Sequence, residues 1–147
     1  MTENKKEINV SFRLRSIDII EEKLEQPLVQ SNKMVLFKFA TKAWHTIVPE
    51  TKSISVQIEV NISADEDPKT LGYFKVGFIY EIENFNSFVK KKPNTFQFPP
   101  DFPVILNSLS LSSVRGIMFS HLKGTFLHGA LLPIMNANIN SYSKNIG

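Results

Sequence analysis

The 147-residue chain contains no cysteine, which excludes disulfides, thiolate metal sites and a cysteine nucleophile. Its three histidines, His45, His121 and His128, match no metal-ligand spacing. The sequence also lacks a G-x-S-x-G turn and a glycine-rich phosphate loop. We therefore predict that the protein is not an enzyme, that it holds no metal and that it uses no cofactor.

Acidic side chains are missing after Asp101, which is the last carboxylate residue of the chain. Residues 109–133 instead form a long, largely apolar segment. A segment of this kind offers more apolar surface than one small sheet can bury. We expect part of it to contact another subunit or a client, which points to a binding protein.

No continuous apolar run has the character of a signal peptide or the length of a membrane span, so we expect a cytoplasmic protein without membrane insertion. The composition, 42% hydrophobic and 21% charged, fits one domain over residues 1–147 with a polar leader at 1–6. Basic residues are scattered among acids, apart from the run at residues 90–92 before Pro93. That run predicts a solvated loop, and we expect no nucleic-acid partner.

Four segments alternate apolar and polar residues and predict strands: residues 8–14, 35–40 continuing towards Ile47, 53–63 and 73–82. The third is the most regular, because isoleucines and valines occupy one face and mainly serine, glutamine and asparagine the other. One polar face indicates an antiparallel sheet that is covered on one side. Residues 18–32, with Pro27, predict a connection of extended or irregular type, and Gly77 predicts a bulge or a close approach.

A long helix is predicted from about residue 102 to about Lys123, with Asp101 as its cap, Pro103 in its first turn and Gly124 as its stop. A short final helix is expected from Ile134 to about Tyr142. Strands first and helices last predict an α+β fold: a four-stranded antiparallel sheet with one face covered by the long C-terminal helix.

Between the last strand and the long helix, residues 85–102 are rich in proline and phenylalanine and predict a loop with a helical turn near residues 85–89. The phenylalanines of this loop allow two interpretations. They form an exposed aromatic patch that binds protein, or they fold back and complete the core. The sequence leaves both open.

These features together resemble the SecB family of export chaperones and their SecB-like relatives, over roughly residues 6–142. The resemblance depends on Arg115, residues 124–126 (Gly-Thr-Phe) and residues 131–134 (Leu-Leu-Pro-Ile), which stand in the family's order. Upstream, residues 73–78 and 82–85 are similar to the family's last strand and the aromatic loop that follows it.

The resemblance implies a holdase chaperone that binds unfolded or extended polypeptides in apolar grooves and prevents their aggregation in protein export. It also implies a homotetramer, a dimer of dimers joined through edge strands and long helices. Carried over to this sequence, the peptide-binding groove would use six residues: Phe78, Tyr80, Phe85, Phe126, Leu131 and Leu132.

The charge of this chain departs from the SecB pattern. SecB proper is acidic and docks on the SecA motor through its sheet, whereas this chain has a pI near 9.1 and only Glu59 on its third-strand polar face. This argues against docking on SecA and favours a dedicated SecB-like chaperone of a toxin–antitoxin module or another client. A non-chaperone interaction module, or a small-molecule-binding or hydrolytic domain using His45 or His121, remain alternatives.

Overall fold

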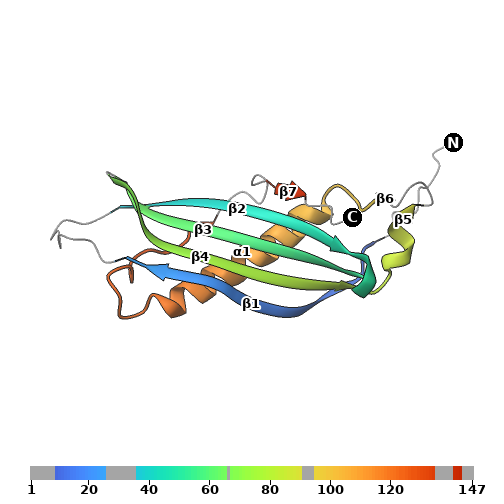
Figure 1. The fold of residues 1–147 in the computed structure, drawn as a ribbon, viewed down its shortest axis with the longest axis horizontal. Coiled ribbons are helices and arrows are strands. Elements are labelled where there is room, and N and C mark those ends of the chain that lie inside the picture. The colour runs from blue at the N-terminus through green and yellow to red at the C-terminus, as the bar shows by residue number, and fades with distance from the viewer. Residues whose placement is uncertain (1–8, 26–35, 66, 91–94, 135–140, 144–147) are drawn as a thin grey trace.

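The structure, a computed structural model, describes residues 9–25, 36–65, 67–90, 95–134 and 141–143. Its main sheet contains four long antiparallel strands and a short fifth strand, in the order β1-β4-β3-β2-β7 (Figure 1). The strands are β1 (Phe12–Leu24), β2 (Phe37–Val48), β3 (Ser53–Ala64), β4 (Asp67–Ile82) and β7 (Ser141–Ser143). One helix, α1 (Phe102–His121), crosses one face of the sheet obliquely. The predicted α+β fold is confirmed.

The core lies between α1 and the inner face of β3 and β4. The alternating residues of β3, from Ile54 to Ile62, are all buried, as are those of β4 from Phe74 to Ile82. From the helix, Leu106, Val114 and Met118 pack against this face. Fully burying one such side chain contributes roughly 1.5–3 kcal/mol, so this face supplies most of the stability of the fold.

β1 is longer than predicted, because residues 18–24, expected to belong to an extended or irregular connection, are extended and continue the strand. Two register shifts against β4 explain why the alternation was hard to follow: one lies between Leu14 and Ser16, the other between Ile19 and Glu21. Each shift places two successive side chains on the outer face. After each shift, the parity of the inward positions changes.

Gly77 of β4 lies under the second irregularity. A Cβ atom at Gly77 would lie 3.0 Å from Cδ1 of Ile20, so the absence of a side chain allows Ile20 to pack directly on β4. The close approach predicted at Gly77 is therefore confirmed, and the bulges themselves lie in the neighbouring strand β1.

The phenylalanine-rich segment folds back onto the core. It contains η2 (Phe85–Phe88), β5 (Val89–Lys90) and β6 (Thr95–Phe96). Phe85, Phe88 and Phe102 are buried, and Phe96 and Phe98 pack against them half-buried. Ring centroids lie 5.0 Å apart for Phe88 and Phe98 and 5.5 Å apart for Phe98 and Phe102. The helical turn is confirmed, and the alternative of an exposed aromatic patch is wrong, because these rings stack on one another.

The ends of α1 agree with the prediction to within two residues. The helix carries Pro103 in its first turn and ends at His121, and Gly124 adopts a positive φ of 78°. Asp101 lies at the N-cap position, but the predicted side-chain cap is wrong, because its carboxylate makes no capping hydrogen bond. The expected final helix differs: residues 135–140 lie outside the described residues, and Ser141–Ser143 form a strand, so a helix does not reach Tyr142. The leader at residues 1–6 also lies outside the described residues.

By length and composition alone, α1 is long and apolar enough to cross a membrane. The expectation that no segment has the length and apolar character of a membrane span was therefore wrong. The mean hydropathy of the helix is this high because it carries apolar side chains on two sides. Leu106, Val114 and Met118 face the sheet, while Ile105 and Leu109 are exposed. A core helix with a second apolar side can be as long and as apolar as a membrane span, and α1 packs as a core helix.

His45 joins β2 to α1, because its Nε2 lies 2.7 Å from Oδ1 of Asn107. Burial lowers the pKa of His45, and the hydrogen bond to Asn107 opposes this only in part. The folded state therefore takes up a proton at His45 less readily than the unfolded chain, whose histidine pKa is 6.5.

We expect the free energy of unfolding to decrease as the pH falls below about 6.5, because the unfolded chain then binds a proton that folded His45 resists. The contribution is complete above that pH and is lost as the pH falls through the lower pKa of the folded state. Urea unfolding at pH 7.5 and 5.0, at one protein concentration, measures the change. His45→Gln keeps an amide donor without a titrating ring, so its free energy of unfolding should decrease less between pH 7.5 and 5.0 than that of the wild type. Equal decreases in the two proteins would contradict the assignment to His45.

Candidate functional site

The six residues predicted to line a peptide groove do not share one surface. Phe78, Tyr80, Phe85 and Leu132 are buried, Phe126 is half-buried, and only Leu131 is well exposed, at 57%. Tyr80 is also bound to α1 by a hydrogen bond, because its hydroxyl lies 2.8 Å from the Ser110 hydroxyl. Buried side chains offer no surface to a client in this conformation, so a role for them in peptide binding stays a prediction.

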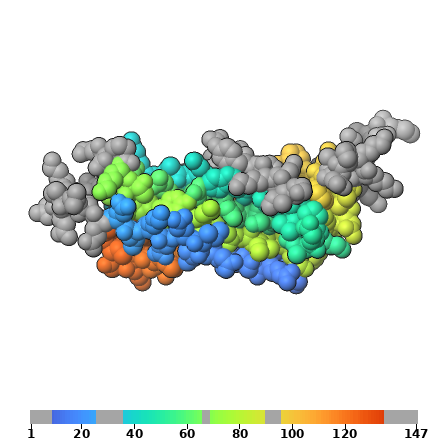
Figure 2. Space-filling view, in the orientation of Figure 1, coloured from blue at the N-terminus to red at the C-terminus, as the bar shows by residue number. Residues whose placement is uncertain are grey.

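Exposed apolar side chains gather instead on β1, the terminal strand of the sheet. We call Leu14, Ile17, Ile19 and Leu24 the β1 strip; each is between 38% and 43% exposed. Leu14, Ile17 and Ile19 pair with the core residues of β4, which places them on the helix side of the sheet. In Figure 2 the blue atoms of β1 run from the left of the molecule to its lower right border, and the orange segment near the C-terminus lies below them at the left. β1 is thirteen residues long and carries charged side chains as well, so it is the apolar strip on its helix side that proteins normally cover.

The second apolar surface is the side of α1 that faces away from the sheet. Ile105, Leu109 and Phe119 are exposed there, and Ser112 and Gly116 complete the spacing of three and four residues between them. A Cβ atom at Gly116 would meet nothing within 4 Å. This α1 outer stripe therefore has apolar ends and a small-residue centre, where another chain can approach the helix closely.

The segment after α1, residues 122–134, forms the C-terminal hook. Leu127 and Leu132 are buried, whereas Leu131 and Ile134 point outward, and Ile134 is 92% exposed. The first turn of the hook is closed by Thr125, whose hydroxyl donates to the carbonyl of Leu122 at 2.7 Å. The hook is thus anchored by buried leucines and adds exposed apolar side chains beside the helix.

Arg115 holds the far end of the hook against the helix. Its Nε donates to the carbonyl of Leu132 at 2.8 Å, and its Nη2 donates to the carbonyl of Pro133 at 3.1 Å. The sequence singled out Arg115 by resemblance alone. The lone basic residue in the middle of an apolar helix was the available signal for such a contact, but its partners lie 17 and 18 residues away.

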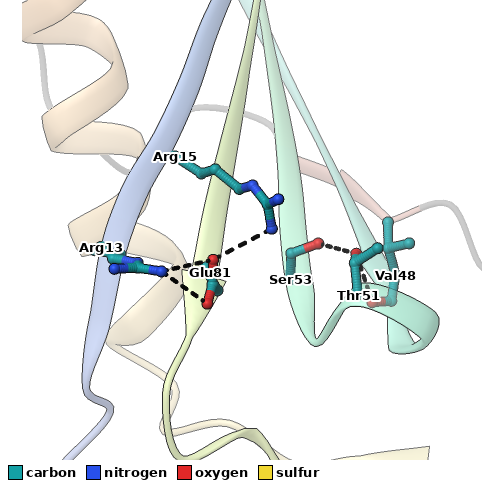
Figure 3. A network of polar contacts seen from close by, with 6 residues as sticks. All are labelled: Arg13, Arg15, Val48, Thr51, Ser53 and Glu81. Carbon is teal, nitrogen blue, oxygen red and sulfur yellow. Dashed lines mark hydrogen bonds and ion pairs between the residues drawn. The ribbon is translucent and has the colours of Figure 1, made fainter.

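The outer face of the sheet is polar and ionic. Glu81 accepts from Arg13 at 3.2 Å and pairs with Arg15 at 3.3 Å (Figure 3). Nearby, the hydroxyl of Tyr73 donates to Glu59. Two causes raise the pKa of Tyr73: the larger is its partial burial, and the second is this hydrogen bond. Exposed pairs of this type add little stability. The outer face therefore interleaves both signs of charge around a few exposed apolar side chains, among them Ile20 and Ile79.

Two of the three histidines, His45 and His121, are used in structural contacts. His45 bonds to Asn107, and Nδ1 of His121 lies 3.0 Å from Oε2 of Glu22, which ties the end of α1 to β1. Within the described ranges, no three His, Asp or Glu side chains are placed to hold a metal ion. These contacts give no support to the hydrolytic alternative at His45 or His121.

We expect Arg115→Ala to lower the free energy of unfolding by about 1–3 kcal/mol, because two backbone carbonyls lose a charged donor. Arg115→Lys should fall between the alanine variant and the wild type, since an ammonium group cannot reproduce the paired geometry of guanidinium. Urea unfolding gives the free energies, and binding of a hydrophobic dye reports exposure of the hook. An alanine variant as stable as the wild type would show that Arg115 does not hold the hook.

Comparison with known proteins places the fold but no sequence family. No protein-family model matches the chain, and no curated protein matches it by sequence. Among solved structures, the chain is similar to the Mycobacterium tuberculosis Rv1957 SecB-like chaperone, solved with a ChAD peptide from the Rv1956 HigA1 antitoxin. The TM-score is 0.58 at 10% identity, covering 84% of this chain and 90% of that one.

A protein of unknown function from Streptococcus agalactiae aligns with a TM-score of 0.41 at 9% identity, over 79% of this chain and 90% of that chain. The similarity to Rv1957 extends over most of this chain and most of that one. The chain therefore has the α+β fold of a SecB-like chaperone.

Proposed function

We propose that this protein is a SecB-like holdase chaperone that binds unfolded or extended polypeptides and prevents their aggregation. The observation that carries the proposal is the apolar surface left on the helix side of the sheet, formed by the β1 strip, the α1 outer stripe and the exposed residues of the hook. The SecB-like fold supports it, because Rv1957 is a chaperone of this fold in complex with a peptide.

We propose that part of this surface joins subunits, and that the subunits form a homotetramer built from two dimers. β1 ends the sheet and carries the apolar strip on its helix side, so a second β1 can continue the sheet and cover the strip. The centre of the α1 outer stripe, at Ser112 and Gly116, leaves room for a second helix. Stable interfaces bury about 1,200–2,000 Å² in total, and two long elements per subunit can supply such an area.

For the client, we propose a dedicated polypeptide in the cytoplasm rather than general export through SecA. The outer face of the sheet carries Arg13, Arg15 and Lys75 beside Glu59 and Glu81, so it does not offer the acidic surface that docking on SecA requires. Rv1957 was solved with a peptide from an antitoxin, and a client of that kind fits a toxin–antitoxin module. Apolar grooves accept extended segments without demanding one sequence.

Suppression of aggregation of an unfolded test protein measures the holdase activity, and light scattering measures the subunit number. We expect the wild type to assemble and to suppress aggregation. Ile17→Glu places a charge in the β1 strip and should weaken assembly at least about tenfold, since burying an unpaired charge costs more than 1.4 kcal/mol. Holdase activity should fall with it.

The matched control is Ser16→Glu, which adds the same charge one residue away on the outer face, opposite Ile79. It should keep both assembly and holdase activity. A wild type that neither suppresses aggregation nor binds unfolded protein would overturn the chaperone proposal. If that wild type assembled and captured one folded partner, the alternative of a non-chaperone interaction module would replace it.

A further inference from the structure

The short strand β7 occupies the opposite edge of the sheet from β1. Its residues Ser141, Tyr142 and Ser143 pair with Ala43, Trp44 and His45 of β2. This pairing is parallel, whereas β1 to β4 pair antiparallel throughout. β2 is twelve residues long, and β7 lies beside three of these positions, near the middle of the strand.

A strand on an edge is held mainly by backbone N–H and C=O groups, so the edge accepts extended segments of many sequences. β7 is a weak occupant in this respect. It is three residues long, two of the three are serines, and parallel pairing is slightly less stable per residue than antiparallel pairing. A longer extended segment can pair with more of β2 and gain hydrogen bonds that β7 cannot form.

The residues of β2 near this edge suit an apolar extended segment. Phe37, Phe39 and Ile47 are only half-buried on the inner side, where they pack at the border of the core. Leu36, just before the strand, is 67% exposed. Because side chains of a paired strand alternate between two faces, an added strand would find apolar neighbours on the inner side along much of β2.

We propose that β7 is an internal competitor for the edge of β2: an extended client pairs with β2 by displacing Ser141–Ser143. The inference rests on the proposed holdase function and adds its regulation. Without a client, the C-terminal strand covers the middle of the edge and limits edge-to-edge association of chaperone molecules. When a client arrives, its longer pairing replaces the strand. Affinity for the client is therefore reduced by the stability of the β2–β7 contact.

The absence of native cysteine allows a reversible test. In Trp44→Cys/Tyr142→Cys the two cysteines are register partners on adjacent strands, a separation that a disulfide can bridge. The probe is labelled reduced, carboxymethylated α-lactalbumin, which stays unfolded, and its binding is followed by fluorescence anisotropy. We expect the oxidised protein to bind the probe at least about tenfold more weakly than the same protein after reduction.

The control lock is Ala40→Cys/Asn61→Cys, a register pair that joins β2 to β3 and leaves β7 free to leave the edge. Its affinity for the probe should not change on oxidation. A second variant, Tyr142→Pro/Ser143→Pro, acts in the opposite direction. Since the N–H groups of successive strand residues point to opposite sides, one of the two prolines removes an N–H group that faces β2. It should bind the probe about three- to tenfold more tightly, and Tyr142→Ala/Ser143→Ala, which keeps both N–H groups, should change less.

The outcomes separate this inference from the proposed function. Equal binding by the oxidised and reduced Trp44→Cys/Tyr142→Cys protein would overturn the competition while leaving the holdase intact. Failure of this pair to crosslink while the control pair does would show that β7 does not occupy β2, and would overturn it too. A wild type that fails to bind the probe at all would remove the holdase and the competition together.

Discussion

The coverage of a long sheet by one helix is the constraint on which the rest of this structure depends. Strands of 12 to 16 residues extend about 40–50 Å, whereas a 20-residue helix extends about 30 Å. α1 therefore covers β3 and β4 along an oblique path and leaves the inner side of β1 partly open (Figure 1). The phenylalanine loop fills one end of the uncovered face with Phe85, Phe88 and Phe98.

This shortage of cover gives the two edges of the sheet different characters. β1 keeps exposed leucine and isoleucine side chains on its helix side, which suits a permanent interface with another subunit. β2 instead carries β7, a short strand from its own chain. An apolar strip at one edge and a short, backbone-based contact at the other match the two tasks of the proposed chaperone, assembly and the reversible binding of extended polypeptide.

The regular parts of the fold could be predicted because each local pattern agrees with its final environment. Residues 53–63 alternate without interruption, so their inward side was evident, and Asp101, Pro103 and Gly124 marked the ends of α1 closely. β1 was only half predicted, because its two bulges change the inward parity at Ser16 and again at Glu21. The groove residues were the least predictable part: Phe78 and Tyr80 are aromatic whether they meet a client or, as here, fill the core.

By itself the sequence determined the α+β class, the chemistry it excludes and the surplus of apolar residues after Asp101, because composition and period are local properties of the chain. Only the tertiary structure decided which apolar residues are surplus. Phe85 and Leu132 are buried while Ile17 and Leu109 are exposed, although all four are equally apolar. The reason is that burial depends on which element lies opposite, and contacts such as Arg115 with Leu132 or β7 with β2 join residues far apart in the chain.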